Sequence, residues 1–277
     1  MESRGLRVAL RIWVVLVLLV LFLPIALIFL YAFDKSTVQS WPISGFTLRW
    51  FSVAWHDPEV RQAFLLSLKV GLLATVIALV LGSMVAYAVH KFAFFGRDAV
   101  SFILVLPIAL PGIVTALALS SAVESSRTSI GLTFGLTAII LGHATFCVVV
   151  VYNNVIARLR RTPGSLTEAS MDLGGDGPTT FRRISLPNMR TALIAGALLA
   201  FGLSFDEIVV TKYLAGTVET LPLWIYGNIQ RPFDRPIVNV VAVVVLLLSI
   251  IPIYIAQRLT GSAQGIASAE AEEAGPG

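Results

Sequence analysis

The sequence predicts an all-α integral membrane protein with six transmembrane helices. Of its 277 residues, 57% are hydrophobic and only 13% are charged, whereas soluble domains contain about 25% charged residues. Six apolar segments are each long enough to cross a hydrocarbon core of about 30 Å as a helix. Only a helix can bond all the backbone groups of such a segment in lipid. The predicted spans are Ile12–Phe33, Phe64–Val89, Ala99–Val123, Leu132–Ile156, Ala192–Leu214 and Ile237–Gln257.

The first predicted span follows three arginines, Arg4, Arg7 and Arg11, a pattern that also begins secretory signal peptides. Its apolar run continues to Phe33, which exceeds the length of a signal-peptide core, and no Ala-x-Ala cleavage motif follows. We therefore interpret Ile12–Phe33 as a retained membrane anchor.

The third predicted span, Ala99–Val123, contains Pro107 and Pro111. Proline lacks a backbone N–H, so each proline leaves a carbonyl group in the preceding turn without its usual partner. In a membrane such carbonyls are satisfied by a neighbouring helix or face a water-lined cavity. The span is a candidate pore wall, and a kink used only for packing explains the prolines equally well.

The positively charged residues predict which connections face the cytoplasm. Twelve lysines and arginines lie in the N-terminus, the connections 90–98 and 157–190 and the tail from Arg258, and seven lie in the other connections. The excess places both termini in the cytoplasm, and an even number of spans also requires that they share a side. We expect one permease domain over 1–260 and a disordered tail over 261–277, where Ala, Gly and Glu dominate.

The connection 157–190 contains the most specific local pattern. Ser165-Leu166-Thr167-Glu168 matches a capping box and predicts a helix of about two turns that starts at Ser165. Gly174 supplies a left-handed stop, and Gly177-Pro178 opens a second short helix that ends before Pro187. Apolar side chains and six arginines share this connection, so we expect it to bind a protein in the cytoplasm.

These residues resemble the cytoplasmic signature of the permease subunits of binding-protein-dependent ABC importers, which reads Glu-Ala-Ala, then Gly, then Ile-x-Leu-Pro. Ser170 replaces the second alanine here. The resemblance extends from Gly45 to Arg258 and is closest to the second permease subunit of spermidine/putrescine-type importers. The residues that it assigns to ATPase coupling are Glu168, Ala169, Leu173, Gly174, Ile184, Leu186 and Pro187.

The resemblance implies a type I ABC importer permease, whose cytoplasmic coupling helix sits in a groove of the ATPase. Its partners would be two ATPase subunits, a second permease and an extracytoplasmic binding protein in a prokaryotic plasma membrane, without nucleic acid. ATP and magnesium would be bound by the ATPase subunits, because this chain has no Gly-x-x-x-x-Gly-Lys-Ser/Thr loop to hold phosphates. The chain itself is expected to need no cofactor and to be a transport subunit rather than an enzyme.

Two acidic residues, Asp206 and Glu207, lie inside the fifth predicted span, where an ionised carboxylate costs about 3 kcal/mol. They line a path for a cation, or they serve the fold as partners of Lys69 or Lys212 or as a cap where the helix breaks. Neighbouring helical residues point about 100° apart, so we expect only one to bind substrate, and we favour Asp206. The resemblance also places the aspartate of the run that begins at Ser204 on the substrate path.

The resemblance places Trp50 near the outer gate, where its ring would hold a cation, although a tryptophan of the membrane interface explains this residue as well. Spermidine permeases carry an aspartate where this chain has Gly112. The transported species therefore stays open between polyamines, a smaller diamine, an amino acid and another organic cation.

Two other classes of protein agree with parts of the sequence. A self-sufficient secondary transporter or channel agrees with the broken third span and the buried acids, but the sequence shows no repeated halves. An intramembrane hydrolase would recruit Ser204, His143 and Asp206, but no zinc motif or recognised frame surrounds the serine. His143 itself is a proton relay or a hydrogen-bonded core residue. The single cysteine, Cys147, excludes an internal disulfide and a cysteine-built metal site.

Overall fold

Helices are the only named secondary-structure elements of the computed structural model over the residues that it describes, 4–231 and 235–273. Within these residues, five helices are long and apolar enough to cross a membrane, and α4 (Arg97–Ala109) and α5 (Gly112–Ile130) qualify as a bent pair. The predicted all-α membrane fold is confirmed. The chain forms two compact units, which are Met1–Gln62 with Trp224–Leu248, and Ala63–Leu223 with Ser249–Gly277.

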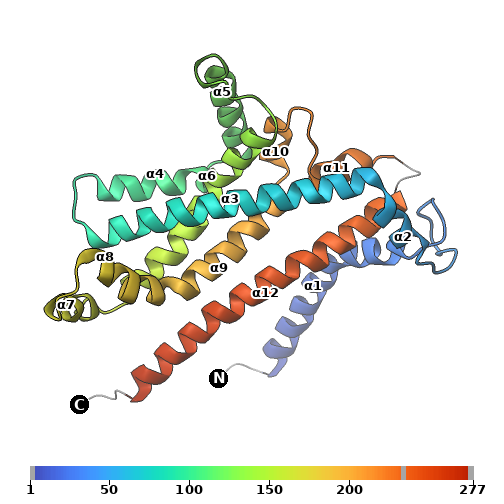
Figure 1. Cartoon of the computed structure of the whole chain (residues 1–277). Coiled ribbons are helices and arrows are strands. Elements are labelled where there is room, and N and C mark those ends of the chain that lie inside the picture. The colour runs from blue at the N-terminus through green and yellow to red at the C-terminus, as the bar shows by residue number, and fades with distance from the viewer. Residues whose placement is uncertain (1–3, 232–234, 274–277) are drawn as a thin grey trace. The chain divides into compact units, whose positions relative to one another are not determined.

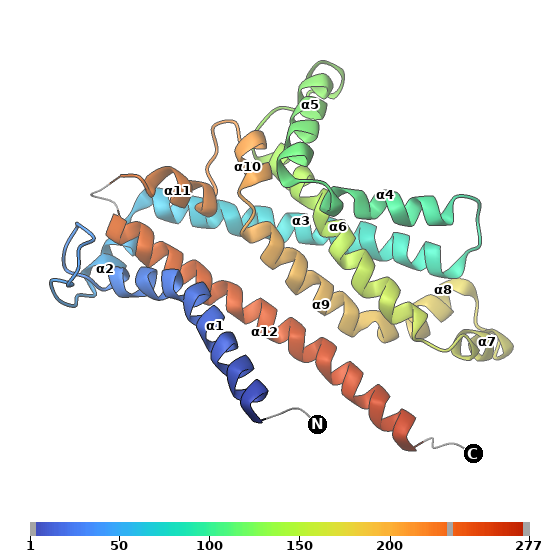
Figure 2. The same cartoon turned by 180° about the vertical axis from the view of Figure 1, so that it is seen from behind.

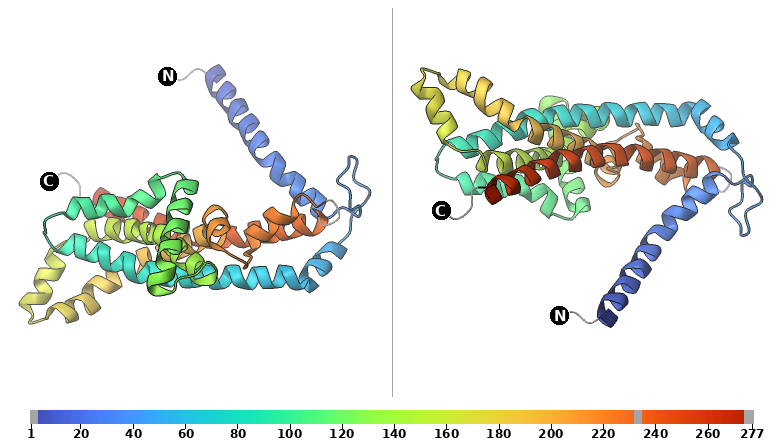
Figure 3. Two further views of the ribbon diagram at one scale, coloured as in Figure 1. Left: turned by 90° about the horizontal axis from the view of Figure 1, so that it is seen from above. Right: turned by 90° about the horizontal axis from the view of Figure 1, so that it is seen from below.

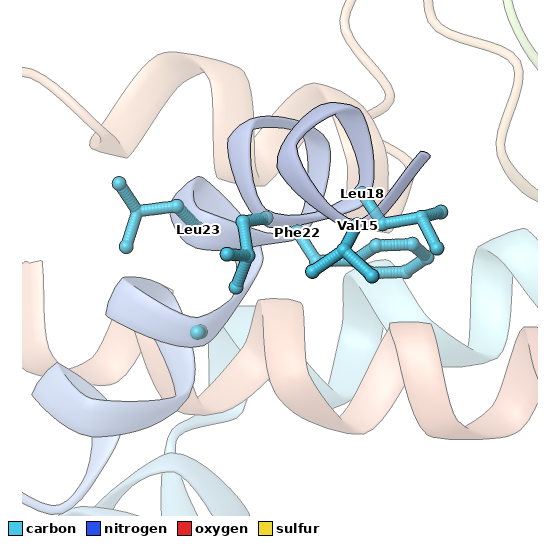
Figure 4. A pocket seen from close by; sticks show the side chains of 6 residues that line it. Val15, Leu18, Phe22 and Leu23 are labelled. Atoms are coloured by element: carbon cyan, nitrogen blue, oxygen red, sulfur yellow. The ribbon is translucent and has the colours of Figure 1, made fainter. Parts of the chain in front are cut away.

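The first unit contains the apolar helix α1 (Arg4–Ala32) and three further elements. These are α2 (Arg49–His56), the greater part of α11 (Leu221–Asn228) and the beginning of α12 (Arg235–Glu273). A shallow hollow on α1 is lined by side chains of this helix alone (Figure 4), so it is a corrugation of an apolar helix surface and suits lipid contact. Its lining residues are Val15, Leu18, Leu19, Phe22, Leu23 and Ala26.

The connection after α1 folds around the buried side chain of Asp34. Its Oδ1 atom accepts hydrogen bonds from the Ser36 N–H at 3.2 Å and from the Ser44 N–H and hydroxyl at 3.2 and 2.9 Å. Burial raises the pKa of Asp34, but the hydrogen bonds from Ser36 and Ser44 outweigh it, and the pKa lies below its ordinary value. This carboxylate is therefore ionised at neutral pH and fixes the loop.

The second unit contains most of α3 (Pro58–Lys91), the pair α4 and α5, and α6 (Leu136–Arg160). The elements that follow are α7 (Ser165–Asp172), α8 (Gly177–Thr180), the π-helical turn η1 (Phe181–Ser185), α9 (Leu186–Phe205) and α10 (Val209–Leu214). Figures 1 and 2 show α6 and α9 side by side. The core of this unit is formed largely by α6, whose fully buried side chains include Ile139, His143, Cys147, Val151 and Val155.

α10 packs against both α5 and α6. The contact with α6 requires a glycine, because a Cβ atom added at Gly142 would overlap Cδ1 of Leu214 and lie 3.1 Å from Cγ1 of Val210. Protein interiors leave no room for such an extra methyl group. Gly142 therefore lets the short helix α10 approach the N-terminal part of α6 closely.

The third predicted span is broken rather than kinked. α4 ends at Ala109, α5 begins at Gly112, and the two helices are bent by 107°; Figure 3 shows the turn from above. Leu110 has an extended backbone (ψ 148°), the conformation that a following proline imposes. The span therefore ends one helix and starts another at Pro111, and its role as a pore wall stays a prediction.

The fifth predicted span, Ala192–Leu214, is wrong at its C-terminal end. α9 ends at Phe205 and α10 begins at Val209, so the two acidic residues lie between helices instead of inside one. The gap provides polar backbone groups and cap positions, which explains how acidic residues are accommodated there.

The disorder expected of the tail 261–277 stays a prediction, although the residues up to Glu273 continue α12. α12 is helical to Glu273, because Ala, Glu and Gln, which form much of residues 261–273, are strong helix formers. Residues 274–277 of this tail lie outside the described residues.

Candidate coupling segment and substrate path

The candidate coupling segment comprises residues 165–187. Its first helix, α7, begins at Ser165 and has the predicted length of two turns. The predicted capping box is wrong, because Gly164 already has helical dihedrals (φ −62°, ψ −28°) and no side chain bonds the first turn. The Glu168 N–H donates instead to the Gly164 carbonyl oxygen at 3.2 Å.

The predicted glycine stop is confirmed. Gly174 has φ +81°, a left-handed conformation that costs residues with a Cβ about 1–2 kcal/mol. Its N–H donates to the Met171 carbonyl at 2.9 Å, and the Gly175 N–H donates to the Ser170 carbonyl at 2.9 Å. These bonds satisfy carbonyl groups at the end of α7 and turn the chain toward α8.

A cap that the sequence reasoning missed starts α8. The Asp176 Oδ1 atom accepts a hydrogen bond from the Thr179 N–H at 2.9 Å, and hydrogen bonds from the side chain and N–H of Thr179 lower the pKa of Asp176. A hydroxyl contact of 2.9 Å between Ser170 and Thr180 joins α7 to α8. Asp176 followed by Gly177-Pro178 is a recognisable N-cap pattern in the sequence.

The second helix does not end before Pro187, contrary to the prediction. The chain passes through η1 directly into α9, and the Leu186 N–H bonds the Phe181 carbonyl five residues earlier. The wider π turn places Pro187 in the first turn of α9, where no N–H is required. α8, η1 and α9 thus form one helical rod, and Arg158 at the end of α6 bonds it through the Asn188 carbonyl oxygen at 3.0 Å.

The coupling residues lie mainly at the surface. Glu168, Ala169, Gly174, Leu186 and Pro187 are exposed, and Ile184 is half-buried. Leu173 is 89% exposed, which is unusual for a leucine that follows a helix in water and indicates a partner surface. Figure 2 shows α7 at the end of the second unit, beyond the ends of α6 and α9.

A second site lies at the break between α9 and α10, where His143 of α6 joins both helices. His143 Nδ1 lies 2.8 Å from the Ser204 hydroxyl of α9, and Nε2 lies 2.9 Å from the Thr211 hydroxyl of α10. Thr211 donates its own proton to the Glu207 carbonyl oxygen at 2.8 Å. It therefore accepts from Nε2–H, and Ser204 donates to Nδ1.

This chain of hydrogen bonds explains the histidine as a neutral core residue. His143 is 1% exposed and Ser204 is 3% exposed, and both ring nitrogens are occupied by hydroxyl groups. The arrangement is not the catalytic triad that a hydrolase would need, since Nε2 bonds Thr211 and Asp206 bonds neither His143 nor Ser204. The sequence reasoning did not predict the role of Thr211.

The two acidic residues at the break differ in their surroundings. The Glu207 Oε1 atom accepts the Val210 N–H at 2.9 Å, so this side chain caps α10, as one of the weighed alternatives predicted. The Asp206 side chain is exposed and makes no hydrogen bond or ion pair with other described residues. Neither Lys69 nor Lys212 therefore pairs with Asp206 in the described parts of the chain.

Gly112 lies beside the same break. A Cβ atom added there would be 4.0 Å from Cγ1 of Val209 and would meet no closer atom. Since α5 and α10 pack together, the structure brings Gly112, Ser204, Asp206 and Glu207 into one region. The breaks between α4 and α5 and between α9 and α10 thus adjoin each other.

Trp50 belongs to the first unit, whereas Gly112, Ser204, Asp206 and Glu207 belong to the second. Its Nε1–H donates to the Asp34 carbonyl oxygen at 2.8 Å, and the Arg49 guanidinium lies 5.4 Å from its ring centroid. The ring is buried, which differs from an exposed tryptophan of a membrane interface. Its role at an outer gate stays a prediction.

Comparison with known families identifies a match over most of the chain. The profile of the family described as binding-protein-dependent transport system inner membrane component matches residues 78–262. This range covers the coupling segment and the two adjoining helix breaks.

Two named relatives and one solved structure are similar over nearly their full lengths. The spermidine/putrescine transport system permease protein PotC of Haemophilus influenzae is 30% identical over 87% of this chain and 91% of its own length. The putrescine transport system permease protein PotI of Escherichia coli is 31% identical over 84% of this chain and 85% of its own. A chain of a bacterial ABC transporter that imports alginate shares the fold, with a TM-score of 0.69, 18% identity and coverage of 93% and 98%.

Proposed function

The chain belongs to the family of binding-protein-dependent transport system inner membrane components, and we propose that it imports polyamines or a related small organic cation by using ATP hydrolysed in partner subunits. It is the membrane-spanning permease of an ABC importer. The observation that carries the substrate proposal is the Asp206 carboxylate, which is exposed and unpaired beside two helix breaks.

The chemistry of a polyamine fits this carboxylate. A polyamine is a flexible chain of ammonium groups, and each group that leaves water needs a fixed negative charge or oxygen acceptor in its place. Asp206 has this charge free for a ligand, whereas Glu207 is engaged in capping α10. Relatives of this chain are named as spermidine/putrescine and putrescine permeases.

The coupling segment is the proposed contact with the ATPase. Its exposed apolar residues Leu166, Leu173 and Leu186 offer a surface for a protein partner. α8, η1 and α9 form one helical rod that ends at the Asp206 break. A displacement of the coupling segment is thus transmitted along α9 to the carboxylate of Asp206.

The proposed assembly contains two ATPase subunits, a second permease and an extracytoplasmic binding protein, and the dependence on a binding protein agrees with the family's description. ATP and magnesium are held by the ATPase subunits, and this chain is not itself an enzyme. Both termini and the coupling segment face the cytoplasm, on the side that the excess of lysine and arginine indicates. Trp50 is proposed to lie near the outer gate.

Cysteine cross-linking tests the coupling proposal. The chain has one cysteine, Cys147, and it is buried, so an introduced cysteine reacts alone. In the assembled complex, Leu173→Cys should cross-link to the ATPase, whereas Ile130→Cys, which is also well exposed and is the last residue of α5, should not. Equal cross-linking of the two variants, or none in an assembled complex, contradicts the proposed contact.

Replacing Asp206 by Asn tests the substrate proposal. Asn keeps the shape and one acceptor oxygen but removes the charge, so uptake should fall, and more for spermidine than for putrescine. Subunit abundance should stay normal, because no described side chain depends on Asp206. Normal abundance with unchanged polyamine uptake would assign the importer to an uncharged or anionic solute.

Gly112→Asp is the complementary variant. A Cβ atom added at position 112 meets only Cγ1 of Val209, at 4.0 Å, so the backbone there has room for the first side-chain atom. A second carboxylate beside Asp206 should favour the substrate with more ammonium groups, which raises spermidine uptake relative to putrescine. An unchanged ratio of the two uptake rates would show that position 112 lies off the path.

A further inference from the structure

The turn between α3 and α4 combines aromatic and basic side chains at the surface. Phe92, Phe94 and Phe95 are all exposed, and Phe95 is exposed completely. Lys91 precedes them at the end of α3, and its Nζ atom lies 5.4 Å from the Tyr87 ring centroid and 5.7 Å from that of Phe92. Exposed phenylalanines are unfavourable in water and need an apolar surface.

Basic residues from three elements meet beside this turn. His90 of α3 lies within electrostatic range of Arg97 at the start of α4 and Arg160 at the end of α6, and α4 and α6 pack together, with the hydroxyls of Ser101 and Tyr152 2.9 Å apart. Neither these residues nor Lys91 form an ion pair with an acidic side chain in the described parts of the chain. Asp98, the neighbouring acid, is exposed and bonds none of them. Such a cluster of like charges attracts an external anion.

The membrane places this turn at the lipid surface. α3 has 34 residues, which corresponds to about 51 Å of helix and exceeds the hydrocarbon core of about 30 Å. Its end therefore reaches the headgroup region. α4 then returns with exposed apolar side chains, among them Phe102 and Ile103, which suit the acyl-chain region.

We propose that the α3–α4 turn and the end of α6 bind the phosphate of an anionic phospholipid headgroup. Lys91, Arg97 and Arg160 supply the charge, and the phenylalanines of the turn insert among the upper parts of the acyl chains. This combination favours lipid over a protein, because only a membrane surface offers a phosphate layer and an apolar layer at adjacent depths. The site is independent of the transported solute and of the ATPase contact.

Lipid retention tests the proposal. The full transporter is reconstituted into nanodiscs of phosphatidylcholine with phosphatidylglycerol and then washed in mild detergent, and the retained phosphatidylglycerol is measured by mass spectrometry. Replacing Lys91, Arg97 and Arg160 together by Gln should weaken retention by about tenfold or more, as expected for three basic residues at an anionic surface. The matched control replaces Lys35, Arg61 and Arg231 by Gln and should retain the lipid.

A second variant checks the apolar component. Phe95→Ser keeps every charge and changes an exposed side chain, so the protein folds while its retention of phosphatidylglycerol falls by a smaller factor. Equal retention by the triple variant, its control and Phe95→Ser overturns the proposal. Loss of the ATPase subunit from the triple variant with unchanged lipid retention also overturns it and assigns the basic cluster to a protein interface.

Discussion

Helices stop at both functional regions of the second unit, but they stop in different ways. The coupling segment ends α7 with local means, which are the left-handed Gly174 and a hydroxyl contact between Ser170 and Thr180, ten residues apart. The α9–α10 break is held by His143, which is 61 and 68 residues away from its two partners. The first region is exposed, whereas the side chains of His143, Ser204 and Thr211 that hold the second are buried.

This difference follows from the solvent around each helix end. An exposed helix end obtains bonds from its own turn and from water, so it needs no partner from another helix. A helix end inside a membrane protein has no water to bond, and unsatisfied groups cost several kcal/mol each. The exposed segment is thus held by local contacts alone, as its proposed role in coupling requires, whereas a residue distant in the sequence holds the break beside Asp206.

His143→Ala should have the largest effect on the stability of the complex, because it removes the residue that holds the α9–α10 break. The substitution leaves the buried hydroxyls of Ser204 and Thr211 without their partner, at a cost of about 1–3 kcal/mol each, and also opens a cavity. Thermal unfolding of the purified complex should show a clear loss of stability, and subunit abundance should fall. A stable and abundant His143→Ala complex with full uptake would mean that the network does not hold the break.

Thr211→Val should have an intermediate effect. Valine has nearly the same shape as threonine but no hydroxyl, so the Nε2–H of His143 loses its acceptor, which costs about 1–3 kcal/mol. Thr211→Ser keeps the hydroxyl and is the matched control. Melting temperatures that do not separate the Val variant from the Ser variant would show that the hydrogen bond between His143 Nε2 and Thr211 does not stabilise the break.

Gly174→Val should have the smallest effect on stability and a large one on transport. The left-handed conformation at φ +81° is strained by about 1–2 kcal/mol for a residue with a Cβ, but the strain acts on an exposed turn. We expect a normal melting temperature with lost uptake. Gly164→Ala is the control, since Gly164 is helical and has open space around it; if both variants transport equally, the turn does not need its observed shape.

The same difference explains what could be predicted from the sequence. The length of α7 and the Gly174 turn depend on a few neighbouring residues, and both were predicted. The capping box failed because Gly164 adopts a helical conformation that its residue type does not require. The prediction that the second short helix ends before Pro187 was wrong, because the π turn η1 accommodates the proline and the helix continues.

The contacts at the α9–α10 break could not be predicted from neighbouring residues in the sequence. Asp206 and Glu207 were identified as costly inside a span, but their division into one free carboxylate and one cap depends on where α9 ends. The pairing of His143 with Thr211 depends on the packing of α10 against α6. Neither feature has a periodic pattern that a single sequence reveals.

Uptake by the purified complex in proteoliposomes tests directly whether the chain is the permease of an ATP-driven importer. Labelled spermidine and putrescine are supplied with the binding protein on the extracytoplasmic face, and ATP is supplied on the face that carries the ATPase subunits. We expect uptake that requires ATP and is lost in Gly174→Val. Uptake that proceeds without ATP and follows an imposed ion gradient would contradict it and would assign the chain to the self-sufficient secondary transporters.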